Sequence, residues 1–197
     1  MASKQNRWSD HYSRRAKREN YPARSVYKLQ EMQQRYKLIR KGDRVLDLGC
    51  YPGSWLLYAA RLTTGSGQVA GIDQKKVTVA LPGHVSVHIG DVTTQAEALL
   101  EQIGEPFQVV LSDMAPATTG QKDVDAARSY ELCLTALQFA DRLLSRSGNF
   151  VCKIFQGSEF AEFSNAVKQR FKTDRIYKPR SSRKASKEIY IIGIGKI

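Results

Sequence analysis

Apolar residues in this chain follow two alternating periodicities. Short and nearly continuous apolar runs, such as residues 107–112, are typical of buried strands, whereas apolar positions that recur every three to four residues, as in 125–145, are typical of helices. The pattern predicts strands at 44–48, 68–72, 85–89, 107–112, 149–155, around 173–178 and at 188–195, and helices at 25–37, 54–62, 95–102, 125–145 and 158–171. Strands and helices therefore alternate along most of the chain.

This alternation predicts the fold class. Repeated strand–helix–strand units form right-handed crossovers and a mostly parallel sheet. The last two predicted strands have no obvious helix between them, so they should pair antiparallel. We therefore expect an α/β, Rossmann-like fold in which a mostly parallel seven-stranded sheet has a final antiparallel strand and helices on both faces.

Charge is distributed unevenly along the chain. Residues 1–44 hold 13 basic and 4 acidic residues, residues 45–167 hold 8 and 13, and residues 168–197 hold 10 and 2. If the two basic ends meet in space, they form the cationic surface expected for a polyanion partner; the alternative is solvated charge that keeps the protein soluble. The 197 residues suit one domain, residues 1–197, with a basic helical extension over 1–44 and a core over 45–197.

Cysteine usage and hydropathy predict a cytoplasmic protein. Cys50, Cys133 and Cys152 are odd in number and lack the spacing of a redox or metal motif, which favours buried, reduced thiols. His84 and His88 have no cysteine or histidine cluster nearby, so we expect no metal site. No run approaches the roughly 18 apolar residues of a membrane helix, and the N-terminus has no apolar signal core. We therefore expect no membrane partner.

Residues 45–55, VLDLGCYPGSW, join an apolar strand to a glycine-containing loop and then to a helix. In parallel α/β sheets, ligands bind at such loops, beyond the carboxyl ends of the strands. The pattern Asp-x-Gly-x-x-Pro-Gly differs from the glycine loops that bind dinucleotides or nucleoside triphosphates. Asp73 ends the next strand, where its carboxylate would accept hydrogen bonds from a ribose diol. Together these features indicate S-adenosylmethionine as cofactor, and an ordinary tight turn is the alternative.

Four ionisable residues are predicted at loop or strand ends that face the same edge of the sheet: Lys28, Asp113, Lys153 and Glu188. Lys153 interrupts an apolar strand, where a lysine is costly unless it is paired or functional. One such charge alone would more often be a structural ion pair. Four of them at a cofactor edge favour a catalytic site.

The chemistry of these side chains suits a ribose hydroxyl as methyl acceptor. Because a sulfonium already activates its methyl group, the enzyme must align an oxygen behind the carbon and help to remove a proton. Lys153 would do this if the neighbouring Lys28 disfavours its protonated form, with Asp113 and Glu188 orienting the two lysines. Alternatively, Lys153 stays protonated and positions the hydroxyl by hydrogen bonding.

Five segments carry a family resemblance: ARSVYKL at 23–29, the cofactor loop at 47–55, SDMAP at 112–116, VCKIFQG at 151–157, and the region from Ser181 to Tyr190. In these segments, and from about residue 8 to the end, the chain resembles the FtsJ/RrmJ family of heat-shock-type RNA 2′-O-ribose methyltransferases. The resemblance implies a Rossmann-like methyltransferase fold, whose sheets typically end in such a hairpin.

The resemblance also implies residue roles. It makes Lys28, Asp113, Lys153 and Glu188 a catalytic tetrad, with Lys153 at its centre. It makes Gly53, Trp55, Asp73, Asp91 and Asp113 contacts of S-adenosylmethionine. Without the motif, Trp55 would be interpreted as a core aromatic and Asp91 as a helix N-cap. The cofactor loop departs from the usual Asp-Leu-Gly-Ala-Ala-Pro-Gly-Gly-Trp at Cys50, Tyr51 and Ser54, which affects the detailed shape of the pocket.

The substrate implied by the resemblance is a structured RNA. We expect a uridine of large-subunit ribosomal RNA, in a ribosomal particle, modified by a monomeric enzyme. A tRNA 2′-O-ribose methyltransferase and a non-catalytic RNA-binding ribosome assembly factor are alternatives. A methyltransferase acting on a base nitrogen, a protein or a small molecule is a further one; base-nitrogen enzymes commonly carry Asn/Asp-Pro-Pro-aromatic after the fourth strand, where this chain has Asp-Met-Ala-Pro.

Overall fold

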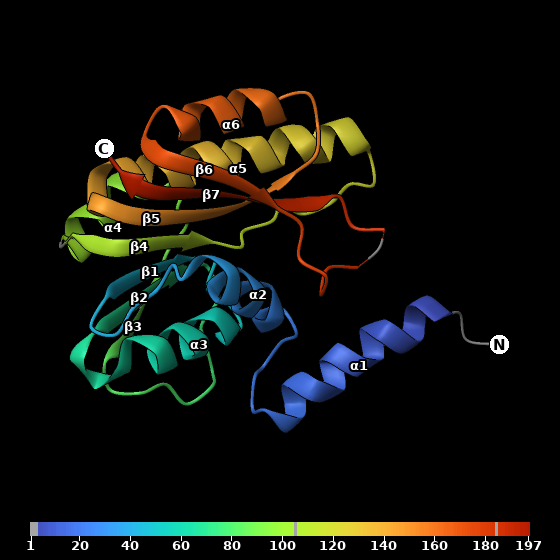
Figure 1. Cartoon of the computed structure of the whole chain (residues 1–197), viewed down its shortest axis with the longest axis horizontal. Coiled ribbons are helices and arrows are strands. Elements are labelled where there is room, and N and C mark those ends of the chain that lie inside the picture. The colour runs from blue at the N-terminus through green and yellow to red at the C-terminus, as the bar shows by residue number, and fades with distance from the viewer. Residues whose placement is uncertain (1–3, 105, 184) are drawn as a thin grey trace.

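The computed structural model describes residues 4–104, 106–183 and 185–197, and its centre is one twisted sheet (Figure 1). In this described part of the chain the sheet has seven strands in the order β3-β2-β1-β4-β5-β7-β6. The strands are β1 (Arg44–Leu48), β2 (Gln68–Asp73), β3 (Val85–Ile89), β4 (Phe107–Ser112), β5 (Leu144–Phe155), β6 (Phe171–Tyr177) and β7 (Glu188–Lys196). Strands β1 to β5 pair in parallel, and β7 lies antiparallel between β5 and β6. The predicted fold class is confirmed.

Helices cover both faces of the sheet (Figure 1). Helices α4 (Ala96–Ile103), α5 (Lys122–Leu143) and α6 (Phe160–Lys168) pack on one face, where Leu46, Phe150 and Ile191 belong to their apolar cluster. Helices α2 (Val26–Tyr36) and α3 (Ser54–Thr63) pack on the other face, with Val45 and Ile192. A short 3-10 helix, η1 (Thr64–Ser66), follows α3. The central strands are buried from both sides, which explains why they are nearly continuous apolar runs.

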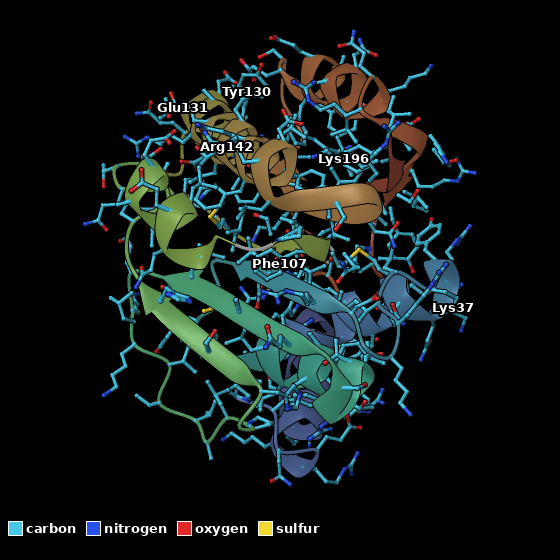
Figure 2. The ribbon with its side chains drawn as sticks, turned by 90° about the vertical axis from the view of Figure 1, so that its left-hand side faces the viewer. Lys37, Phe107, Tyr130, Glu131, Arg142 and Lys196 are labelled. Atoms are coloured by element: carbon cyan, nitrogen blue, oxygen red, sulfur yellow. The ribbon has the colours of Figure 1, made fainter. Side chains whose placement is uncertain are left out.

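The predicted helix over 125–145 extends too far toward the C-terminus. Helix α5 ends at Leu143, because Leu144 already pairs with Phe107 as the first residue of β5. The end of α5 is stabilised by Lys196, whose ammonium donates hydrogen bonds to the carbonyls of Ala140, Asp141 and Leu144 at 2.8, 2.7 and 2.8 Å. Figure 2 shows Lys196 and Phe107 at this end of the sheet. Burial lowers the pKa of Lys196.

Helix α1 (Lys4–Arg18) lies apart from the sheet and beside α2 and α3 (Figure 1). It is attached by a small apolar cluster in which Ala16 packs with Tyr21, Val26 and Tyr27. The predicted N-terminal extension is therefore helical in two pieces, α1 and α2. No helix in the described ranges is long and apolar enough to cross a membrane.

The basic N-terminal and C-terminal segments meet in space. The carboxylate of Glu31, on α2, accepts hydrogen bonds from the Tyr177 hydroxyl at 3.1 Å and from the backbone N–H groups of Arg180 and Ser181 at 2.7 and 2.8 Å. The Arg24 guanidinium donates to the carbonyl of Ser181 at 2.6 Å. These contacts hold the loop after β6 against α2 (Figure 1), so the two cationic parts of the sequence form one surface.

Candidate active site

The loop between β1 and α3 forms the base of a pocket at the carboxyl ends of the parallel strands. Gly49 has φ +76°, and a Cβ atom there would lie 2.6 Å from Cγ of Met114. Gly53 has φ +108°, and a Cβ atom there would lie 2.9 Å from Cγ1 of Val77. Both positions require glycine, because their conformation is strained for other residues and the space beside them is filled. The loop therefore keeps its backbone close to the neighbouring strands.

The pocket has a volume of about 580 Å³ and lies where the strand order reverses, between the loops after β1 and β4. Open α/β sheets bind ligands at this position. Its lining includes Gly49, Tyr51, Asp73, Gly90, Asp113 and Met114. Two of these six, Asp73 and Asp113, were predicted as site residues from the sequence.

Asp73 is held in place at the rim of this pocket. Its Oδ2 atom accepts a hydrogen bond from the backbone N–H of Tyr51 at 2.9 Å, and its Oδ1 atom accepts one from the N–H of Lys75 at 2.8 Å. A carboxylate oxygen has more than one acceptor direction, so a ligand diol can still bind. Its expected contact with a ribose remains a prediction.

Two ion pairs bring together the four predicted catalytic residues. Lys28 Nζ lies 2.8 Å from Glu188 Oε1, and Lys153 Nζ lies 3.0 Å from Asp113 Oδ1. Lys153 also donates to the backbone carbonyl of Asp113 at 2.5 Å. The side chains come from α2, the residue after β4, the C-terminal end of β5 and the start of β7. Asp113 both lines the pocket and pairs with Lys153, so it joins the pocket to the ion pairs.

Tyr190 completes this cluster and was not predicted from the sequence. Its hydroxyl donates to Asp113 Oδ1 at 2.5 Å, and its ring centroid lies 5.9 Å from Lys28 Nζ. Tyr190 is opposite Lys153 in the antiparallel register of β5 and β7. Its position two residues after Glu188 places both on one face of β7, which is the sequence signal that could have identified it.

Electrostatics stabilise the ionised form of Asp113. Burial by itself raises the pKa of a carboxyl group, but at Asp113 the charges of Lys153 and Lys28 and the hydrogen bond from Tyr190 outweigh it, so the pKa lies below its usual range. Burial and the neighbouring charges of Asp113 and Glu188 raise the pKa of Tyr190 well above its usual value. Tyr190 is therefore a neutral donor that faces a carboxylate.

Asp47 is a second carboxyl group near the pocket that was not singled out as a site residue. It is 1% exposed, and neither of its oxygens has a hydrogen-bond partner among the described residues. Burial, together with the charges of Asp113 and Asp73, raises the pKa of Asp47 well above its usual range. The protonated form of Asp47 is therefore favoured, which avoids an unpaired buried charge behind the pocket.

Three predicted cofactor contacts lie outside the residues that line the pocket. Gly53 is buried under Val77, and Trp55 is 3% exposed, with its indole N–H donating to the carbonyl of Ser25 at 2.9 Å. Asp91 accepts hydrogen bonds from the backbone N–H and the hydroxyl of Thr93, which lower its pKa, and its two neighbours in the chain line the pocket. Their roles toward the cofactor remain predictions.

The unusual loop residues each have a local explanation. Ser54 accepts a hydrogen bond from the N–H of Ala23 at 2.8 Å and donates one to its carbonyl at 3.1 Å, which attaches the segment before α2 to α3. Tyr51 is 48% exposed at the pocket rim, where its ring centroid lies 5.4 Å from Lys75 Nζ. Cys50 is buried against Gly71. It is a free thiol, as are the other two cysteines, which are also buried.

The topology and the pocket define a class of protein. A parallel sheet with one antiparallel strand inserted between β5 and β6, and a ligand pocket above the loop after β1, are the features of a Rossmann-like methyltransferase. Among solved structures, the crystal structure described as that of a ribosomal RNA methyltransferase from Plasmodium falciparum is similar, with a TM-score of 0.77 and 27% identity. The similarity covers 89% of this chain and 98% of that one.

Sequence comparison then gives the family. The model of the FtsJ-like methyltransferases matches residues 21–196, and the chain belongs to this family. Over 193 residues it is 58% identical to ribosomal RNA large subunit methyltransferase E of Desulforapulum autotrophicum. These residues cover 98% of this chain and 95% of the relative. It is 50% identical to the protein of the same name from Desulfosudis oleivorans, over 95% of this chain and 90% of the relative.

Proposed function

We propose that this methyltransferase transfers a methyl group from S-adenosylmethionine to a ribose 2′-hydroxyl of RNA, with a uridine of large-subunit ribosomal RNA as the expected nucleotide. The observation that carries the proposal is the Lys153–Asp113 ion pair beside Lys28–Glu188, at the edge of the pocket. A buried lysine held by a carboxylate at a ligand pocket is suited to binding or deprotonating a hydroxyl. We treat residues 1–197 as one methyltransferase domain.

The residues around the pocket fit this cofactor. A side chain at Gly49 would collide with Met114. The bare backbone at Gly49 therefore forms part of the pocket wall. Asp73 offers an oriented carboxylate for a ribose diol, and the stretch from Met114 to Ala117 forms an opposite wall. When bound, S-adenosylmethionine supplies a methyl group activated by the positive charge on sulfur. The chain's own residues then have to present the oxygen and manage its proton.

Lys153 is the residue we assign to the acceptor hydroxyl. Its side chain has one fixed direction, because Asp113 holds the ammonium through both its carboxylate and its backbone carbonyl. Tyr190 donates to the same carboxylate oxygen, and Lys28 adds a second positive charge near it. In this proposal Lys153 first releases one proton to solvent. Its neutral amine then binds the acceptor oxygen and takes up the hydroxyl proton as the new oxygen–carbon bond forms. Glu188 pairs with Lys28 and fixes the position of that second charge.

The surface where the two basic segments meet supports RNA as the substrate. Residues 1–44 and 168–197 carry net charges of +9 and +8, and the contacts of Glu31 hold them together beside the ion pairs. Two relatives that cover nearly the whole chain are named as large-subunit ribosomal RNA methyltransferases, which favours ribosomal RNA over tRNA. The ion-paired tetrad argues against a purely RNA-binding assembly factor.

Mapping of the methyl group tests the proposal directly. Total RNA and undermethylated large ribosomal subunits are incubated with the protein and methyl-labelled S-adenosylmethionine, and the labelled nucleotide is then identified. We expect one 2′-O-methylated ribose whose 3′ linkage resists alkaline cleavage, and no label on DNA of matched sequence. Label on a base, a protein or a small metabolite would refute the substrate assignment. Single-turnover transfer distinguishes an enzyme from an assembly factor with an unused pocket.

A further inference from the structure

A second concave site, of about 620 Å³, is lined by residues of α1, α2 and the end of β6. Its lining includes three tyrosines and three arginines: Tyr12, Tyr27, Tyr177, Arg15, Arg35 and Arg180. We call it the tyrosine–arginine groove. It shares no lining residue with the pocket over the cofactor loop, so it is a separate site.

The floor of the groove is one face of α2. It is lined by the pairs Gln30/Gln34 and Glu31/Arg35, and the members of each pair lie four residues apart, as neighbours on the helix surface. The Glu31 carboxylate is already used within the protein, because it accepts three hydrogen bonds from Tyr177 and the following loop. The groove therefore offers amide groups on its floor and positive charge at its rim.

Flat side chains in the groove stack on one another. The Arg15 guanidinium lies 4.5 Å from the centroid of the Tyr27 ring, and the Arg35 guanidinium lies 5.6 Å from that of Tyr177. Guanidinium and tyrosine planes are the surfaces on which proteins stack unpaired RNA bases. Lys178 and Arg180 are exposed beside them, where a phosphate could bind.

The groove is continuous with the tetrad through one helix. Tyr27 lines the groove and Lys28, the next residue of α2, pairs with Glu188. From Lys28 to Arg35 the helix rises by about 10 Å. The loop that Glu31 holds at the rim leads into β7, which starts at Glu188. A strand of RNA with its reacting ribose at Lys153 would therefore pass the groove.

We propose that the tyrosine–arginine groove binds one unpaired nucleotide of the substrate RNA, next to the segment that carries the methylated ribose. The base stacks on the Tyr177 and Arg35 planes, the side-chain amide of Gln34 reads its edge, and Lys178 binds its phosphate. This inference rests on RNA being the substrate. The charge of the surface alone would bind RNA of any sequence, whereas the groove would add contacts that depend on the base.

The test compares three groove variants, Gln34→Ala, Arg35→Ala and Lys178→Ala, with matched variants of exposed residues on α5 or at the start of β5, outside both basic segments: Gln138→Ala, Arg146→Ala and Lys122→Ala. Each protein is equilibrated with short single-stranded RNA oligonucleotides of randomised sequence and with the same sequences as duplexes. Bound RNA is sequenced, and KM and kcat for ribosomal RNA are measured separately. The binding measurement needs no methyl transfer, so it is independent of the proposed reaction.

We expect the wild type to prefer single strands and to enrich one base. Gln34→Ala should abolish that enrichment and raise KM for RNA roughly tenfold, with kcat and cofactor affinity unchanged, while the three matched variants behave as wild type. If Gln34→Ala leaves both base enrichment and KM unchanged, the groove reads no base. If Arg35→Ala and Lys178→Ala weaken all sequences and duplexes equally, the surface makes phosphate contacts only; both results overturn the inference. A wild type that methylates no RNA would instead refute the proposed function.

Discussion

Tyr190 donates a 2.5 Å hydrogen bond to Asp113 Oδ1, the carboxylate oxygen that also lies 3.0 Å from Lys153 Nζ. The two donors are opposite each other in the register of β5 and β7, so the antiparallel strand places both beside the end of β4. One carboxylate oxygen thus orients a cation and a phenol at once. The insertion of β7 between β5 and β6 is what makes this arrangement possible.

Lys153 provides the first prediction about the chemistry. Lys153→Ala should lower kcat by about 10²- to 10⁴-fold, the usual effect of losing a proton-transferring side chain, while affinity for the cofactor changes little. Lys153→Arg should fail as well, because a guanidinium does not readily release its proton. Single-turnover transfer and calorimetry measure the two quantities. Near-normal turnover of Lys153→Ala would exclude the role, and an equal loss of cofactor binding would make Lys153 a pocket residue.

Removal of the Asp73 carboxylate should weaken cofactor binding. The Asp73 carboxylate lines the pocket and is oriented to accept hydrogen bonds from the cofactor. Asp73→Ala should therefore cost about 1–3 kcal/mol of binding free energy for S-adenosylmethionine. Titration calorimetry on the folded variant measures it, with the fold checked by circular dichroism. An unchanged affinity would remove Asp73 from the proposed cofactor site.

The glycine loop gives a separate prediction with a matched control. Gly53→Val should also weaken cofactor binding, because a Cβ atom at φ +108° would lie within 3.0 Å of Val77 and Val79 and shift the loop. Gly65→Val is the control, since a Cβ atom at Gly65 has no heavy atom within 4 Å. Equal cofactor affinities of the two variants, both folded, would contradict the importance of the loop conformation.

The sequence predicts the central strands well because β1, β2 and β4 are largely buried on both faces and are ended or followed by glycine or aspartate. The prediction is wrong at Leu144. The apolar periodicity continues the predicted helix through this residue, whereas the pairing of Leu144 with Phe107 ends α5 before it. That pairing joins residues far apart in the chain, and local pattern does not contain it.

The candidate site was predictable where a residue breaks an apolar pattern. Lys153 is such a residue, and the structure pairs it with Asp113 as expected. Tyr190 is consistent with an ordinary buried strand, and its position two residues after Glu188 is a weak signal, because its bond to Asp113 joins residues 77 positions apart. Trp55 was assigned to the cofactor by resemblance, whereas its observed hydrogen bond to Ser25 joins α3 to the segment before α2.

Asp47 predicts an unusual pH dependence of stability. The unfolded carboxyl has a pKa of about 3.9, and that of native Asp47 is raised, so between the two values the native state binds one proton more than the unfolded state. Stability then falls as pH rises, by up to about 1.4 kcal/mol per pH unit from this group. Asp47→Asn does not titrate, so the wild type should lose stability relative to it between pH 4.5 and 8 in urea unfolding. A difference that stays constant with pH would contradict the raised pKa.

The basic helix α1 should contribute to RNA affinity without affecting the rate of methyl transfer. Arg14, Arg15, Lys17 and Arg18 lie on α1, and Arg15 lines the tyrosine–arginine groove together with residues of the C-terminal basic segment. Phosphate contacts release counterions, so RNA affinity should fall steeply with salt. Neutralising these four residues to glutamine should raise the RNA concentration needed for half-maximal methylation and flatten the salt dependence, with cofactor affinity and kcat unchanged. Arg142→Gln with Arg146→Gln, at the opposite end of the sheet, is the control for general loss of charge. An unchanged salt slope in the four-residue variant would mean that α1 does not contact the RNA backbone and that its charge serves only solubility.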